Sequence, residues 1–148
     1  MSYRYQFADR NSLLVVSFSE TIAADDLAAL TGRLKADPRF VPEMDRLLVF
    51  DKDTDMSDLS PDALASIRNA IVRLDSAGQT DGGRALKFRS AYVVTVEMQQ
   101  IMAKLYVATW QAERLHRPQI ETFSTISEAL RWLGRGDLKI DLSAGPRP

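Results

Sequence analysis

The chain of 148 residues contains no cysteine and only one histidine, His116. The absence of cysteine excludes disulfides, thiol nucleophiles and thiolate metal ligands. With one histidine, an imidazole-based metal site would need carboxylate partners that the sequence does not place. His116 lies at an expected helix end, where the helix dipole favours a cation, so we expect a structural or solvent-exposed side chain. We expect neither a metal ion nor a cofactor.

An excess of one charge and long apolar runs are also lacking. Nineteen basic residues face twenty acidic ones, and a net charge of −1 gives no general attraction to nucleic acid. Arg84, Lys87 and Arg89 form a small basic cluster without interleaved aromatic residues, which favours a solvated strand end. No apolar run reaches the roughly 20 residues of a membrane span, and the first ten residues do not resemble a signal peptide. We expect a cytoplasmic protein with no membrane span.

Common catalytic signatures are missing as well. The sequence contains no G-x-S-x-G element, no phosphate-binding P-loop and no G-x-G-x-x-G fingerprint. We therefore expect no enzymatic activity and no catalytic residues. A hydrolase that uses Asp51 and Asp53 with Mg²⁺ is an alternative.

The hydrophobic pattern predicts an α/β protein. Alternation over residues 3–7 and an apolar run over 13–18 predict an antiparallel hairpin. Further strands are expected at 46–50, 88–96 and 119–123, and helices at 25–36, 61–77, 98–114 and 126–133. This order predicts a single mixed, largely parallel sheet with crossover helices. We expect one domain over residues 1–136 and a C-terminal tail over 137–148, with 138–142 as a candidate edge strand.

Several phrases resemble one known family. "ADPRF", "RLLVFDKDTDMSDLSPDAL" and "EALRWLG" follow in the order found in bacterial STAS-like proteins, which are related to sporulation anti-sigma-factor antagonists and to lipid-binding SEC14-type domains. The resemblance covers about residues 3–134. It implies a compact domain that acts by binding. In the antagonists, a serine in a "DSSG" phrase is phosphorylated; "DMSDLS" stands in its place here, which makes Ser57 and then Ser60 the candidates for regulatory phosphorylation.

The stretch around those serines is rich in aspartate: Asp51, Asp53, Asp55, Asp58 and Asp62. The spacing partly matches a calcium loop, but Met56 stands where such a loop needs glycine for its sharp turn. A Mg²⁺ site at strand-end carboxylates is a second interpretation. A polar crossover is a third, because Ser60 is a good N-cap for a helix that has Pro61 at its first position.

The expected helix from residue 98 carries two apolar stripes: Met98, Ile101, Met102 and Leu105 in one, and Ala103, Tyr106, Val107 and Trp110 in the other. A surface helix usually needs one such stripe, so the second must face another helix, a ligand or a partner. Met98, Met102, Tyr106 and Trp110 are the candidate contact residues. We expect a protein-interaction or regulatory module, with a second copy of the chain as one candidate partner. A carrier or sensor of a small apolar or lipid-like molecule is the alternative.

Overall fold

The computed structural model describes residues 3–76, 88–110 and 119–142. The five strands are β1 (Tyr3–Ala8), β2 (Leu13–Phe18), β3 (Asp45–Phe50), β4 (Arg89–Val93) and β5 (Gln119–Phe123). The helices of these described residues are α1 (Ala24–Ala36), α2 (Pro61–Ser76), α3 (Glu97–Trp110) and α4 (Ile126–Trp132). The strands form one sheet in the order β1-β2-β3-β4-β5, in which β1 is antiparallel to β2 and the other neighbours are parallel. The predicted fold class is therefore confirmed.

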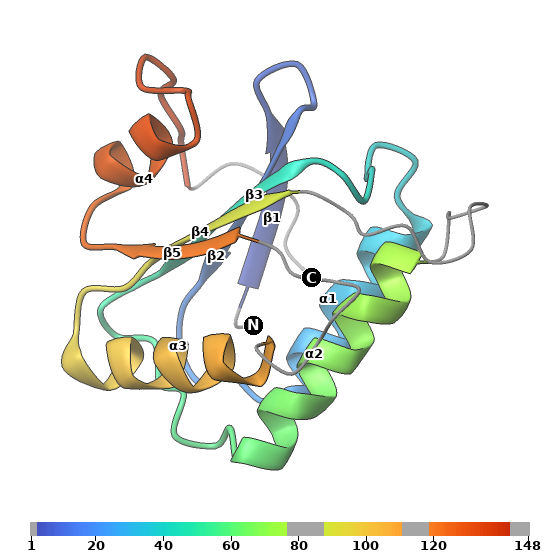
Figure 1. Ribbon diagram of the computed structural model, residues 1–148, viewed down its shortest axis with the longest axis vertical. Coiled ribbons are helices and arrows are strands. Elements are labelled where there is room, and N and C mark those ends of the chain that lie inside the picture. Colours follow the sequence, from blue (N-terminus) through green and yellow to red (C-terminus); the bar gives the residue numbers. More distant parts are fainter. Residues whose placement is uncertain (1–2, 77–87, 111–118, 143–148) are drawn as a thin grey trace.

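The helices cover the two faces of the sheet unequally. Figure 1 shows α1, α2 and α3 on one side of the sheet and α4 on the other. The arrangement follows from the strand order, because β2 to β5 advance across the sheet in one direction. Crossovers of one hand then place every connecting helix on the same face.

Each face of the sheet contributes to its own hydrophobic core. Along β2, Leu14 and Val16 face the three crossover helices, whereas Leu13 and Val15 face α4. The same alternation continues in β3, and it explains why these strands are apolar without interruption. Leu13 and Leu47 are completely buried in the α4-side core.

Two predicted helix starts are confirmed by their caps. The Ser60 hydroxyl oxygen accepts a hydrogen bond from the Ala63 amide at 3.1 Å. The Thr125 hydroxyl oxygen accepts from the Glu128 amide at 3.2 Å, and the same hydroxyl donates to the Glu128 carboxylate at 3.0 Å. Side-chain caps of this kind satisfy amides that have no partner within the helix.

Some predicted boundaries differ from the structure. Strand β4 ends at Val93, three residues earlier than expected, and residues 138–142 form no strand. Leu138, Ile140 and Leu142 instead pack against the α4-side core, so this part of the predicted tail contributes to burial. The domain boundary after residue 136 stays a prediction. The predicted helix ends at 77 and 111–114, together with Arg84, Lys87 and His116, lie outside the described residues.

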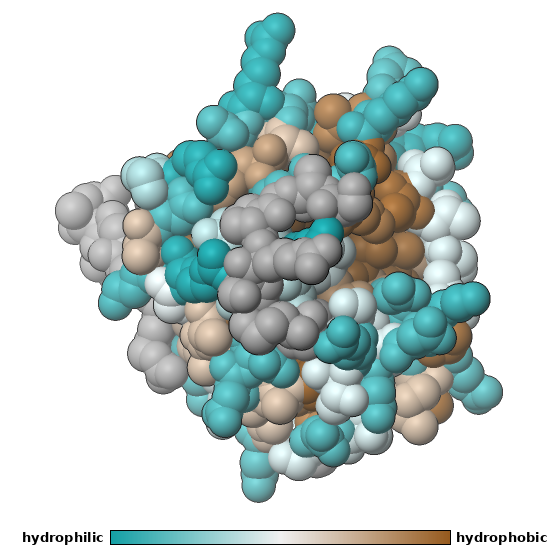
Figure 2. Space-filling view, turned by 180° about the vertical axis from the view of Figure 1, so that it is seen from behind, coloured by the Kyte–Doolittle hydropathy of each residue, from teal (hydrophilic) through white to brown (hydrophobic). Residues whose placement is uncertain are grey.

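The surface is mostly hydrophilic on the side shown in Figure 2, where hydrophobic residues gather in one area. Among residues 3–76, 88–110 and 119–142, no helix has the length and apolar character that crossing a bilayer requires.

Candidate functional site: an apolar cavity beneath three helices

A cavity of about 110 Å³ lies between the sheet and the three crossover helices. Its floor is formed by the strand residues that point toward those helices. Its roof comes mainly from Leu27, Leu30 and Leu34 of α1, Leu64 and Ile67 of α2, and Met102, Ala103 and Tyr106 of α3. Ile22 of the β2–α1 connection and Met56 and Leu59 of the β3–α2 connection complete the lining. Most of the lining side chains are apolar, so the cavity offers an environment that favours apolar molecules over water.

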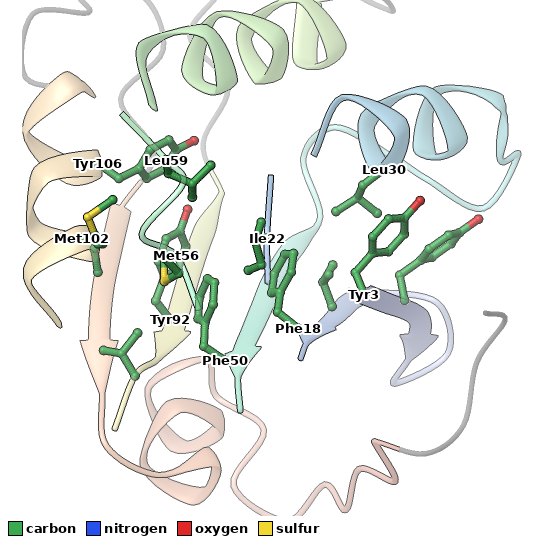
Figure 3. Packing of buried hydrophobic residues seen from close by; sticks show 14 of the residues in the cluster. Tyr3, Phe18, Ile22, Leu30, Phe50, Met56, Leu59, Tyr92, Met102 and Tyr106 are labelled. Atoms are coloured by element: carbon green, nitrogen blue, oxygen red, sulfur yellow. The ribbon is translucent and has the colours of Figure 1, made fainter. Parts of the chain in front are cut away.

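Aromatic rings form a continuous row along this floor. Phe18 and Phe50 stack with their ring centroids 4.8 Å apart, and Phe50 lies 6.1 Å from Tyr92. Tyr92 in turn lies 6.1 Å from Tyr106 of α3. Figure 3 shows Met102 and Tyr106 pointing from α3 toward Tyr92. The row connects β2 to α3, so a ligand in the cavity would contact aromatic faces from the sheet.

A few polar groups also line the cavity. Burial raises the pKa of Tyr92 well above its ordinary value, and the nearby Tyr106 adds to the increase. The Tyr92 phenol is therefore neutral at physiological pH. Arg46 is buried, with its guanidinium carbon 3.9 Å from the centroid of the Phe88 ring and one nitrogen donating to the Pro42 carbonyl at 3.0 Å. Ser90, beside Arg46 in the adjacent strand, is also buried.

Helix α3 has an inner and an outer apolar face, but their composition differs from the prediction. Met102, Ala103 and Tyr106 are buried and line the cavity. Met98, Ile101 and Leu105 are exposed, at 55%, 46% and 48%. The sequence pattern had placed Met102 in one stripe with these three. The face of α3 that packs against the sheet includes Met102 as well as Tyr106, so Met102 is buried.

The four candidate contact residues are thus divided. Met102 and Tyr106 are brought together in the cavity wall, whereas Met98 lies on the outer face. Trp110 is the last residue of α3, and its side chain lies outside the described residues. The structure therefore joins two of the four residues at one site.

Gln99 is a buried residue of α3 that the sequence interpretation missed. Its side chain is only 1% exposed, although it lies between the exposed Met98 and Gln100. The amide nitrogen donates to the Asp51 carbonyl at 2.6 Å, and the amide oxygen accepts from the Thr95 amide at 3.3 Å. The sequence spacing does indicate this burial. Gln99 precedes Met102, Ala103 and Tyr106 by three, four and seven residues, which places it on the same face of the helix. Gln99 therefore joins α3 to the start of the aspartate-rich loop.

Replacement of Gln99 by leucine is expected to lower the free energy of unfolding by about 1–2 kcal/mol, because these buried polar groups lose their partner. Chemical denaturation at neutral pH measures the change. Gln100→Leu is the matched control, since Gln100 is exposed on the same helix, and it should change stability by less than about 0.5 kcal/mol. Equal stabilities for the two variants would contradict the role of Gln99.

The aspartate-rich loop makes short-range hydrogen bonds of the kind expected for a polar crossover. The Asp55 carboxylate accepts from the Ser57 amide at 2.9 Å, and hydrogen bonds from Ser57 lower the pKa of Asp55. The Thr54 hydroxyl donates to the Phe18 carbonyl at 2.9 Å and anchors the loop to β2. Within the part of the chain that the structure describes, which includes all five aspartates, no three acidic or histidine side chains gather into a metal-binding group. The calcium and magnesium interpretations of this loop stay hypotheses.

Both serine candidates lie exposed in this loop. The Ser60 hydroxyl caps α2, whereas Ser57 lies beside the Asp55 carboxylate. A phosphate on Ser60 would be favoured by the N-terminus of α2, and one on Ser57 would meet a neighbouring negative charge. Phosphorylation of either residue stays a prediction.

Comparisons of the chain with protein-family models, with curated proteins and with solved structures gave no match. The STAS-like relationship inferred from the sequence therefore stays a prediction, and the cavity and the α3 surface are interpreted from their own geometry.

Proposed function

We propose that this protein acts by binding, and that a small apolar molecule occupies the cavity beneath α1, α2 and α3. The observation that supports this function is the cavity itself, which is formed by residues from all three helices and from the sheet. Cores are normally packed with few voids larger than a water molecule, so a space of this size in a domain this small needs an explanation.

The cavity volume limits the size of the ligand. An engineered apolar cavity of about 150 Å³ in another protein stays dry and binds benzene. At about 110 Å³, the present cavity suits a ligand of one small ring or a short branched chain. A long acyl chain would require the helices to move apart. The size thus favours a small apolar ligand over an intact lipid.

The test fills the cavity and measures ligand binding. Ala103 is buried in the wall formed by α3, and Ala103→Leu adds three carbon atoms there. We expect the wild-type protein to bind benzene and toluene, as observed by chemical-shift changes at Met102 and Tyr92, and we expect Ala103→Leu to reduce the affinity at least about tenfold. Ala29→Leu adds the same atoms at an exposed position of α1 and should bind as the wild type does.

Native mass spectrometry of protein purified from cells provides an independent measurement, because a retained ligand adds its mass to the chain. No shift with either probe, together with no retained mass, would contradict the proposed binding function. Equal binding by wild type and Ala103→Leu would place the ligand outside the cavity.

A second candidate function is protein association, and the outer face of α3 favours it specifically. Three of the four exposed large hydrophobic residues in the described part of the chain lie on this helix: Met98, Ile101 and Leu105. Their spacing of three and four residues places them in one stripe, and contiguous exposed apolar stripes commonly mark interaction sites. A STAS-like interaction module would use such a surface.

A further inference from the structure

The outer stripe of α3 has a pattern that is complementary to itself. Ile101 lies near the centre of the stripe, with Met98 one turn before it and Leu105 one turn after it. When two copies of a helix pair antiparallel about a two-fold axis, residues equally far before and after the axis face each other. An axis beside Ile101 therefore brings Ile101 against its own copy. Met98 lies three residues before Ile101 and Leu105 four residues after it, about one turn in each direction, so Met98 comes close to Leu105 of the partner subunit.

Charged residues follow the same symmetry. Glu97 and Lys104 are exposed, and their separation of seven residues, or two turns, places both on the same edge of the stripe. In an antiparallel pair the like edges meet, so Glu97 of each copy faces Lys104 of the partner subunit. Neither residue forms an ion pair with any other residue that the structure describes. Both charges are thus available to a partner.

We infer that the outer face of α3 binds a second copy of this chain, with the two α3 helices antiparallel and joined by two Glu97–Lys104 ion pairs. The inference rests on the association function proposed above and names the partner. The choice of a second copy follows from the charges, because Glu97 and Lys104 carry opposite charges and lie four residues before and three residues after Ile101, about one turn on either side of the two-fold axis. A partner of uniform charge would meet one attractive and one repulsive residue on this edge.

The expected dimer is weak and depends on concentration. Stable specific interfaces bury about 1,600 Å² in total, and a single pair of helices of 14 residues falls at the low end of that scale. Sedimentation velocity over a wide range of protein concentrations is therefore the appropriate measurement.

The decisive experiment reverses the charges one at a time. Glu97→Lys places lysine against Lys104 twice in its own homodimer, and Lys104→Glu places glutamate against Glu97 twice. Each variant alone is expected to dimerise about tenfold more weakly than wild type. An equimolar mixture of the two variants forms two attractive pairs again, so a heterodimer should appear with roughly wild-type affinity.

Two matched variants control for the change of charge itself. Asp62→Lys reverses an exposed acidic residue in the first turn of α2, as Glu97→Lys does in α3. Lys35→Glu reverses an exposed lysine in the last turn of α1. Both should dimerise like the wild type, and mixing them should have no effect. Thermal melting confirms that each variant is folded.

A wild-type protein that is monomeric at millimolar concentration, or a mixture of Glu97→Lys and Lys104→Glu that remains monomeric, would overturn the second-copy inference. A photo-crosslinking amino acid incorporated at position 101 captures in cells whatever contacts the outer face of α3. The mass of the adduct then distinguishes a failure of the second-copy inference from a failure of the association function. An adduct of twice the chain mass supports the second copy. An adduct of any other mass overturns the second copy but keeps the association function, and the absence of an adduct overturns both.

Discussion

Replacement of Asp45 by alanine is expected to lower the free energy of unfolding by about 2–3 kcal/mol at neutral pH. The Asp45 carboxylate accepts hydrogen bonds from Arg135 at 2.8 Å and from Arg89 at 3.0 Å, and it also accepts from the Arg89 amide at 3.1 Å. The side chains of Asp45 and Arg135 are only 14% and 15% exposed. Removing the carboxylate takes away the ion pair of Arg89 and one of the two ion pairs of Arg135, whose other partner is Asp9, and such a loss is costly in partly buried sites.

The same carboxylate makes stability depend on pH. Partial burial by itself raises the pKa of Asp45, but the hydrogen bonds from Arg135 and Arg89 outweigh it, so the pKa lies below its ordinary value. A group with a lowered pKa in the folded state stabilises the protein above its unfolded pKa of about 3.9, and this contribution is lost as the pH falls through the folded value. The gap between wild type and Asp45→Ala should therefore narrow as the pH falls below about 4.

Urea denaturation of both proteins between neutral and acidic pH measures the two effects. Asp53→Ala is the control, because Asp53 is exposed in the aspartate-rich loop and should change stability by less than about 0.5 kcal/mol. A loss at Asp45 no larger than that of the control, or a difference that does not vary with pH, would contradict the role given to the arginine pairs.

Leu47→Ala is expected to lower the free energy of unfolding by about 3–4 kcal/mol, which is more than the loss expected for Asp45→Ala. Leu47 is completely buried in the α4-side core, and it lies between Val15 of β2 and Ala91 of β4 in the sheet register. A rigid sheet cannot close around the space left by the lost atoms, so the transfer and cavity terms add. Chemical denaturation gives the difference directly.

The neighbouring Leu48 supplies the matched comparison for this prediction. Leu48 points to the opposite face, is only half-buried, and lines the cavity. Leu48→Ala should destabilise the protein less than Leu47→Ala, and it should enlarge the ligand site, whereas Leu47→Ala should leave ligand size unchanged. If Leu48→Ala is at least as destabilising as Leu47→Ala, the assignment of the two faces is wrong.

The fold could be predicted from the sequence because its elements are specified locally. The run over residues 46–50 predicted a strand, and Ser60 predicted a helix start through a cap that involves a residue three positions away. The alternation of strands and helices then left few possible topologies. Local signals of this kind were sufficient for the sheet order but not for the end of β4.

The contacts that could not be predicted connect residues far apart in the sequence. Arg135 lies at the end of the predicted domain, yet it binds Asp9 at 2.8 Å and Asp45 at 2.8 Å. No pattern around Arg135 indicates partners 126 and 90 positions away. The cavity was equally hidden, because it depends on how closely three helices pack on the sheet, and only the two-faced character of the α3 segment pointed toward it.

The hydrogen bond between Gln99 and Asp51 has a mechanical consequence. It joins part of the cavity roof to the loop that carries Ser57 and Ser60, so a displacement of either segment would strain this hydrogen bond. A molecule large enough to lift α3 would pull on the loop, and a chemical change that rearranged the loop would tilt α3 in return. Ligand entry and loop chemistry would then influence each other without any contact between the ligand and either serine.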